Sequence, residues 1–372
     1  MNVVIIGGGN IGMCLLGDIS RNPSYDVTIC ASRPDDFIAP IEVDDDENGI
    51  SYKSGMFCAT NDVEPAVSKA DVILCTLPAF LRKDFISRVE NIVKPGAYLG
   101  FVPAYGGAEY CCGRLLERGV VVFGLQKVPY IARTKARGRV AGVLSRKKTL
   151  LVGGLPRSMT KECSSLLEQM LNVKCEPLPN YLSAALLPGN PLLHTCGSYV
   201  YLRDYVPGTT YGHQIFYWRE WTDECSRMLF RMSAEMKSVC SSLPLDLSEV
   251  KGIPEYYEVS TPEEFTCKVH GIPSFHNLTL PMIQLSDNSY IPNLKSRFFT
   301  EDFPFGVAMP KGLAKLTGTA TPTIDILLDW YSKVGGGEYF CADGSCGRDL
   351  SCTTVPQVFG LDTTAKLLSF YE

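Results

Sequence analysis

The sequence predicts a two-domain α/β protein, with a doubly wound, mostly parallel sheet in residues 1–180 and a mainly α-helical domain in residues 181–372. Three observations lead to this fold class. The first half alternates short apolar runs with helix-compatible stretches, a glycine-rich turn follows the first apolar run, and the second half places apolar residues at helical spacing. A length of 372 residues also suits two domains.

A glycine-rich turn separates the first predicted strand from the first predicted helix. Residues 3–6 are continuously apolar, which is typical of a strand buried on both faces, and residues 13–19 suit a helix. Between them, Gly7, Gly9 and Gly12 have the G-x-G-x-x-G spacing of a Rossmann-type dinucleotide site. These glycines permit a tight turn, close approach of a pyrophosphate, and close helix packing, respectively. The predicted cofactor contacts in this turn are Gly7, Gly9, Asn10, Ile11 and Gly12.

The end of the second predicted strand indicates which dinucleotide is bound. Residues 26–30 form this strand, and Ser32 and Arg33 follow where an acidic residue would bind the ribose hydroxyls of NAD. A hydroxyl and a guanidinium suit a 2′-phosphate, so the sequence favours NADP(H). NAD(H) stays open, because Arg33 also suits stacking on adenine and because Asp35 and Asp36 are near enough in sequence to reach a ribose.

Further apolar runs extend the predicted sheet. Residues 62–75 predict a helix followed by a strand, and Thr76, Leu77 and Pro78 come next, at the strand end where ligands bind in such sheets. These three residues are therefore predicted cofactor contacts. The acidic stretch 42–48 is interpreted as a solvated loop. The other elements expected in this half are strands at 97–103 and 120–123, a hairpin of two strands at 139–153, and a helix at 159–171.

From residue 181 onward the pattern is helical. Apolar residues within 215–243 recur at steps of three or four, which predicts one long amphipathic helix. The other helices expected here are 181–187, 192–203, 311–318, 322–332 and 362–371.

Composition excludes several classes of function. The 35 Lys and Arg residues against 40 Asp and Glu residues give a net charge of −5, unlike the clustered positive charge of nucleic-acid binders. No apolar run approaches the roughly 18 residues of a membrane span, and the N-terminus lacks a secretory pattern. The 15 cysteines therefore predict buried, reduced thiols in a cytoplasmic protein. With four histidines and no C-x-x-C pair, no metal site is expected.

Two segments of the second half carry groups suited to acid–base chemistry. His194 ends the segment NPLLH at 190–194, and Arg297 and Asp302 lie in RFFTED, which FPFG follows. Reduction of a carbonyl or imine needs a proton donor near neutral pH, a group that orients it, and a cation for a substrate carboxylate. His194, Asp302 and Arg297 can supply these. From the residues alone, the other three histidines compete equally, and Arg297 with Asp302 also fits a surface ion pair.

These two motifs, in this order, resemble the opine dehydrogenase family, the relatives of octopine and nopaline dehydrogenase. The resemblance includes the N-terminal fingerprint and residues 321–325, and covers about residues 3–370. It implies an NAD(P)H-dependent reductive condensation, in which an amino acid condenses with an α-keto acid such as pyruvate and the imine is reduced. It also implies that His194 relays the proton and that Asp302 fixes its tautomer. The predicted substrate contacts are Arg297, Asn190 and Thr195.

Two other functions stay open from the sequence. A sister reductase with the same two domains would convert a keto acid to a hydroxy acid and would need no amino acid. A protein that senses NAD(P) without turnover would dispense with the histidine and aspartate pair. The expected partners are small molecules, with no nucleic acid or membrane among them, and a homodimer is left open.

Overall fold

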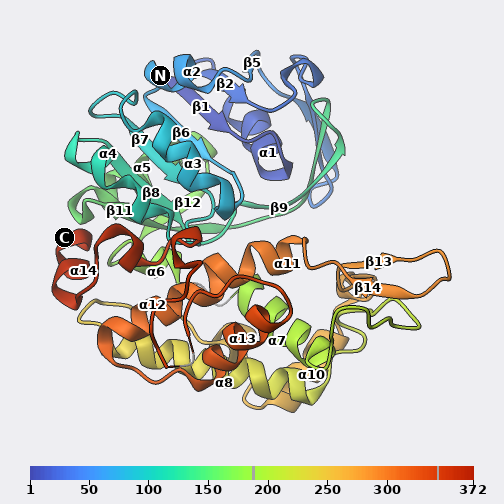
Figure 1. Cartoon of the computed structure of the whole chain (residues 1–372). Coiled ribbons are helices and arrows are strands. Elements are labelled where there is room, and N and C mark those ends of the chain that lie inside the picture. Colours follow the sequence, from blue (N-terminus) through green and yellow to red (C-terminus); the bar gives the residue numbers. More distant parts are fainter. Residues whose placement is uncertain (187–188, 342) are drawn as a thin grey trace. The chain divides into compact units, whose positions relative to one another are not determined.

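The computed structural model describes residues 1–186, 189–341 and 343–372. The chain divides into two compact units, Met1–Leu186 with Leu368–Glu372, and Leu187–Leu367. The first unit combines strands with helices, and the second is mainly helical (Figure 1). The predicted fold class is therefore confirmed.

An eight-stranded sheet lies at the centre of the first unit, in the order β12-β11-β8-β7-β6-β1-β2-β5. Neighbouring strands are parallel, except that β11 and β8 are antiparallel. The strands are β1 (Asn2–Ile6), β2 (Asp26–Cys30), β5 (Cys58–Thr60), β6 (Val72–Cys75), β7 (Tyr98–Phe101), β8 (Val121–Leu125), β11 (Thr149–Leu155) and β12 (Lys174–Pro177). The predicted strands at 3–6, 26–30, 71–75, 97–103 and 120–123 are confirmed.

Helices accompany this sheet, which explains why its strands read as continuous apolar runs. All four residues of β6 are buried, as are the last four residues of β1. The helices are α1 (Asn10–Ile19), α2 (Val63–Ser68), α3 (Ala79–Val89), α4 (Gly113–Glu117), α5 (Thr160–Leu171) and α6 (Leu182–Ala185). The predicted helices at 13–19 and 159–171 correspond to α1 and α5.

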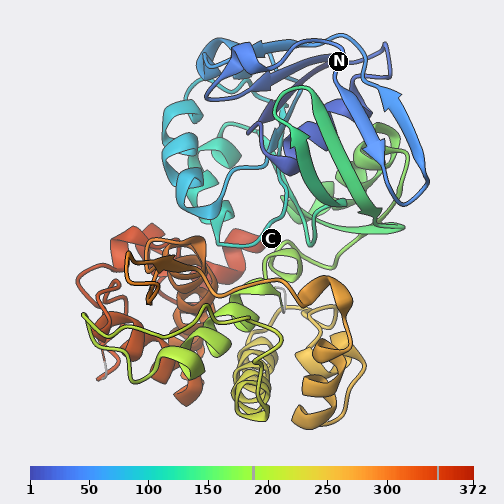
Figure 2. The ribbon, with the colours of Figure 1, turned by 90° about the vertical axis from the view of Figure 1, so that its right-hand side faces the viewer.

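A smaller, four-stranded sheet has the order β4-β3-β10-β9 (Figure 2). Its strands are β3 (Glu42–Asp45), β4 (Ile50–Lys53), β9 (Tyr130–Ala136) and β10 (Val140–Arg146). The predicted hairpin at 139–153 is wrong, because β10 pairs with β9 and β3, whereas β11 belongs to the large sheet. The hairpin turn is instead at Gly138, whose φ of 63° suits a tight turn. Apolar periodicity located both strands but could not assign their partners.

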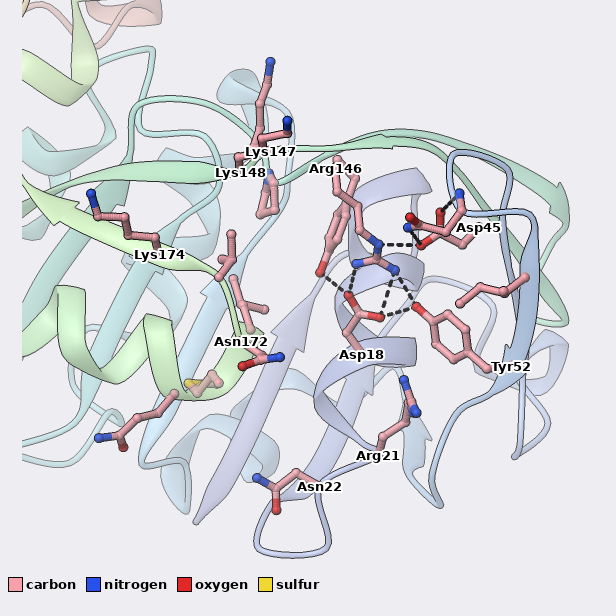
Figure 3. Close-up of a pocket in the computed structure, with 18 residues that line it drawn as sticks. Asp18, Arg21, Asn22, Asp45, Tyr52, Arg146, Lys147, Lys148, Asn172 and Lys174 are labelled. Atoms are coloured by element: carbon pink, nitrogen blue, oxygen red, sulfur yellow. Dashed lines mark hydrogen bonds and ion pairs between the residues drawn. The ribbon is translucent and has the colours of Figure 1, made fainter.

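The predicted solvated loop at 42–48 is also wrong, since β3 begins at Glu42 and Asp45 is only 3% exposed. Arg146 explains this burial. Its Nε lies 2.6 Å from Asp45 Oδ2, and its Nη1 lies 2.6 Å from Oδ2 of Asp18 on α1 (Figure 3). Tyr130 on β9 donates to the same Asp18 oxygen at 2.8 Å. A paired carboxylate can be buried, so acidity alone did not predict solvation.

The second unit is built from helices α7 (Asn190–Leu202), α8 (Asp223–Ser242), α9 (Ile253–Tyr257), α10 (Pro262–His270), α11 (Arg297–Thr300), α12 (Ala308–Thr317) and α13 (Pro322–Lys333), with a small sheet of β13 (Met282–Gln284) and β14 (Tyr290–Pro292). The chain ends in α14 (Thr364–Tyr371). Across the described ranges, no helix has both the length and the apolar character needed to cross a membrane.

The long helix expected at 215–243 begins later than predicted. Helix α8 starts at Asp223, because Thr222 is its N-cap and accepts a hydrogen bond from the Cys225 backbone N–H. Trp218 and Trp221 lie before the helix, and their rings stack at 5.0 Å. Both are buried, so the apolar stripe was read correctly as core, although its first part is not helical.

Candidate functional site

The carboxyl ends of three adjacent strands form the predicted cofactor end of the first unit. Strand β1 lies between β6 and β2, and the backbone N–H of Gly7 donates to Cys30 O at 2.9 Å. On the other side, Thr76 N–H donates to Ile6 O at 2.9 Å. The turn after β1, the turn after β6 and the end of β2 therefore lie together at one edge of the sheet, as the sequence predicted.

The three fingerprint glycines fit a dinucleotide for different structural reasons. Gly7 has a φ of 110°, and a Cβ there would lie 2.6 Å from Thr76 Oγ1. A Cβ at Gly12 would lie 1.9 Å from Gly7 O, so only glycine lets α1 pack this closely on the turn. At Gly9 the space is open, with no heavy atom of the described residues within 4 Å of a Cβ. An open position before a helix N-terminus fits a pyrophosphate.

The other predicted residues of this edge surround that turn. Thr76 Oγ1 donates to Ile6 O at 3.0 Å and to Gly7 O at 3.2 Å, so it supports the turn as well as facing it. Leu77 O accepts a hydrogen bond from Arg82, and Pro78 is the N-cap residue of α3. The cofactor contacts predicted for Thr76, Leu77 and Pro78 stay predictions.

Asn10 and Ile11 form the first turn of α1. The Asn10 side-chain oxygen accepts two hydrogen bonds from Thr134 on β9, from N–H and from Oγ1, each at 2.9 Å. Asn10 thus joins the β9–β10 hairpin to the fingerprint, while Ile11 is half-buried. Thr134 was missed by the sequence analysis, because no local signal links residues 124 positions apart.

Ser32 and Arg33 are exposed just after β2, as a site for the ribose end of a cofactor requires. Arg33 Nε lies 3.4 Å from Asp36 Oδ2. Arg137, from the turn of the β9–β10 hairpin, lies against the same carboxylate and against Ser32. Arg137 is a second residue that the sequence analysis did not single out.

In the second unit, the structure brings His194 and Asp302 together. His194 is on α7, Asp302 begins the π-helical turn η5 (Asp302–Val307), and the two are 108 positions apart. His194 Nδ1 lies 2.8 Å from Asp302 Oδ2. Because this bond holds Nδ1, the ring presents Nε2 to a reactant, and no partner of Nε2 is found in the described part of the chain. Burial raises the pKa of the Asp302 carboxyl, while its bond to His194 acts in the opposite direction.

Aromatic rings fix the orientation of the His194 imidazole. Phe298 stacks on it with centroids 3.6 Å apart, and Tyr217 meets it edge-on at 6.0 Å. Tyr217 also donates to the backbone oxygens of Leu193 and His194 at 2.7 Å and 2.9 Å. A Cβ at Gly197 would lie 2.2 Å from the Tyr217 hydroxyl, so this glycine allows the tyrosine to lie against α7. Neither Tyr217 nor Phe298 could be identified from the sequence as a residue that packs against the histidine.

The position of Asp302 depends on close packing between η5 and the start of α7. A Cβ at Gly306 would lie only 2.3 Å from Pro191 Cβ, so the last residue of the FPFG segment must be small. Wide helical turns of the π type recur at functional sites. The segment NPLLH at 190–194 and the segment FPFG at 303–306 therefore also pack directly against each other.

Arg297 is placed differently from its predicted partners. Its side chain is 66% exposed, and Nε pairs with Glu301, which is only 2% exposed. Asn190, the first residue of α7, is exposed. Thr195 is fully buried, and its Oγ1 donates to Pro191 O at 2.6 Å, so its geometry gives no support to a substrate contact. The substrate roles of these three residues stay predictions.

Comparison with known proteins gives one family and several full-length relatives. Residues 177–334 match the family described as NAD/NADP octopine/nopaline dehydrogenase, alpha-helical domain. Tauropine dehydrogenase of Arabella iricolor is 26% identical over 98% of this chain and 99% of its own length. Octopine dehydrogenase of Pecten maximus is 25% identical over 99% of each chain.

A solved structure of octopine dehydrogenase, with NADH and L-arginine, has the same fold. It superposes with a TM-score of 0.87 at 24% identity, covering 100% of this chain and 98% of the other. The resemblance drawn from the two motifs and the fingerprint is therefore confirmed, and it extends through both units.

Proposed function

We propose, on the premise that this chain is an NAD(P)-dependent oxidoreductase of the opine dehydrogenase type, that it catalyses the reductive condensation of an amino acid with an α-keto acid. The amine attacks the keto carbon, water leaves, and the resulting imine is reduced to a secondary amine. The observation that carries the proposal is the His194–Asp302 pair, held at 2.8 Å within the helical unit that matches the family.

His194 is the residue that accepts and donates protons in this reaction. In its neutral form, Nε2 accepts a proton from the substrate ammonium, which frees the amine for attack. The same nitrogen then returns this proton to the keto oxygen, which takes its second proton from the attacking amine nitrogen and leaves as water. Asp302 is the positioning residue, because its bond to Nδ1 fixes the tautomer in which Nε2 can accept. The reduced nicotinamide supplies the hydride when bound.

Both substrates carry a carboxylate, and Arg297 is the cation that we assign to the keto acid. Its guanidinium is exposed and is oriented by buried Glu301. A planar fork of donors matches a carboxylate better than a lysine would. Asn190, exposed at the start of the same helix as His194, is the second substrate contact that we assign.

We assign dinucleotide binding to residues 1–180 and substrate binding to residues 181–372. Ser32 and Arg33 support a preference for NADPH. They follow β2 where an NAD site has an acidic residue for the ribose hydroxyls, and neither of them is acidic. All 15 cysteines are free thiols, which supports a cytoplasmic enzyme.

The test is oxidation of NADPH and of NADH, followed by absorbance, with pyruvate held constant and amino acids added one at a time. The proposal expects oxidation only when a keto acid and an amino acid are both present. Oxidation with the keto acid alone would replace the proposal with the hydroxy-acid reductase. Tight cofactor binding without oxidation, across a panel of keto acids and amino acids, would favour the sensor.

A further inference from the structure

The β9–β10 hairpin is attached to the predicted cofactor end at two points. At one point, Thr134 donates twice to Asn10 at the start of α1. At the other, Gly138 approaches the segment after β2 so closely that a Cβ would lie 2.2 Å from Asp36 O. The Ile38 N–H also donates to Gly138 O at 3.4 Å. The hairpin turn therefore has a fixed position beside the end of β2.

This attachment brings a second guanidinium to the ribose end of the site. Arg137 Nε lies 2.9 Å from Asp36 Oδ2, and Arg137 Nη2 donates to Ser32 Oγ at 3.3 Å. Arg33 Nε lies 3.4 Å from the same Asp36 oxygen. Two guanidinium groups thus meet at a single carboxylate, and one of them, from Arg137, also binds the hydroxyl of Ser32, 105 positions away.

Convergent guanidinium groups are the usual protein ligands of a phosphate. Here a singly charged carboxylate holds them, whereas a phosphate monoester carries a charge of about −1.5 to −2 near neutral pH. A 2′-phosphate would therefore compete effectively with Asp36. In NAD(H) the ribose has a hydroxyl at that position, and an acidic side chain such as Asp36 can accept a hydrogen bond from it.

We propose that Arg137 and Arg33 together bind the 2′-phosphate of NADP(H), and that Asp36 competes for both and so sets the selectivity between NADPH and NADH. This inference rests on the proposed function only in requiring that the chain bind a nicotinamide dinucleotide. The side chains of Arg33, Arg137 and Asp36 are 67%, 40% and 36% exposed. Ion pairs with this exposure contribute little to folding, so a ligand can displace them without unfolding the protein.

The test is calorimetric binding of two probes, adenosine 2′,5′-bisphosphate and 5′-AMP, which differ only in the 2′-phosphate. Arg137→Ala is expected to weaken binding of the bisphosphate about tenfold, since a charge-assisted hydrogen bond to the phosphate is lost, and to change binding of 5′-AMP less than about twofold. Arg137→Lys keeps the charge without the fork, so its loss should be intermediate. Arg157→Ala is the matched control, because Arg157 is an exposed arginine of the same unit outside this cluster.

Asp36→Asn is expected to do the opposite of Arg137→Ala. It should strengthen the bisphosphate several-fold without strengthening 5′-AMP, and this gain should shrink when Arg137→Ala is also present, because the two residues act on one another.

Three results would overturn the inference. Equal weakening of both probes by Arg137→Ala would mean that Arg137 supports adenine or the fold. An unchanged bisphosphate affinity in that variant would exclude the contact. Failure of the unaltered chain to bind either probe would overturn dinucleotide binding itself, and with it the proposed function.

Discussion

The cofactor end of the first unit and the acid–base pair of the second unit are built in opposite ways. At the cofactor end, the groups that we assign to the pyrophosphate are backbone N–H groups, and six consecutive residues from Gly7 to Gly12 define their positions. The acid–base pair consists of side chains 108 positions apart, and packing between α7 and η5 determines their distance. The glycine-rich turn works because Gly7, Gly9 and Gly12 have no side chains. The acid–base pair, in contrast, requires two particular side chains, those of His194 and Asp302.

This difference predicts how each region responds to substitution. A change at the cofactor end should alter affinity for the dinucleotide, because backbone access is lost. A change in the acid–base pair should alter turnover while the dinucleotide still binds, because no part of the first unit has changed.

The largest expected effect is that of His194→Ala. General acid–base catalysis contributes about 10²- to 10⁴-fold, so we expect turnover to fall about 10³-fold with an unchanged NAD(P)H dissociation constant. Steady-state kinetics and fluorescence titration of the reduced cofactor measure the two quantities. His213→Ala is the control, because His213 is an exposed histidine of the same unit that pairs with Glu220 at 3.1 Å. Near-normal turnover of the His194 variant would remove the distinction between the two regions.

A buried carboxyl of the first unit should affect stability and not turnover. Burial raises the pKa of Glu109, in the helical turn at 108–112, to about 7, and Tyr371 donates to its Oε1 at 3.0 Å. A raised pKa means that the folded state binds the proton more tightly than the unfolded state. The free energy of unfolding should therefore fall as pH rises from about 4.5 to above 7, by on the order of 3 kcal/mol.

Chemical denaturation at several pH values tests this expectation. Glu109→Gln should flatten the dependence, and Glu117→Gln, an exposed carboxyl in neighbouring α4, should leave it unchanged. The same slope in both variants would assign the pH dependence to other groups.

Gly9→Ala should separate ligand access from folding. The Cβ meets open space in the free protein, so the midpoint of thermal unfolding should stay within about one degree. Dinucleotide affinity should fall about tenfold or more, because overpacking costs about 1–3 kcal/mol where the pyrophosphate approaches. Gly12→Ala is the contrasting variant, since its Cβ would clash with Gly7 O and should lower stability as well. Unchanged dinucleotide affinity in the Gly9 variant would show that the pyrophosphate does not bind at this turn.

Arg297→Lys should have the smallest effect. The keto-acid KM is expected to rise about fivefold, because a bidentate fork becomes a point charge worth about 1 kcal/mol less, while the cofactor dissociation constant stays constant. Initial rates at varied pyruvate measure this change. An equal change in both constants would indicate that Arg297 acts through folding of its own segment.

Residues close in sequence could be predicted, and residues joined by packing could not. The strand, turn and helix around Gly9 follow from local periodicity and glycine spacing. His194 and Asp302 were found because each lies in a recognisable motif. Thr134 and Arg137 have no such motif, and they reach the cofactor end only because β10 pairs with β9 and β3 in a separate sheet. Strand partners depend on the whole fold, which a window of sequence does not contain.

Reductive condensation by this chain is tested most directly by identifying the product by mass spectrometry, using an amino acid with an isotope-labelled amino nitrogen, pyruvate and NADPH. We expect one secondary amine that contains the label together with the carbon skeleton of pyruvate, formed in proportion to the cofactor oxidised and lost in His194→Ala. Formation of lactate with the labelled amino acid left unchanged would contradict it.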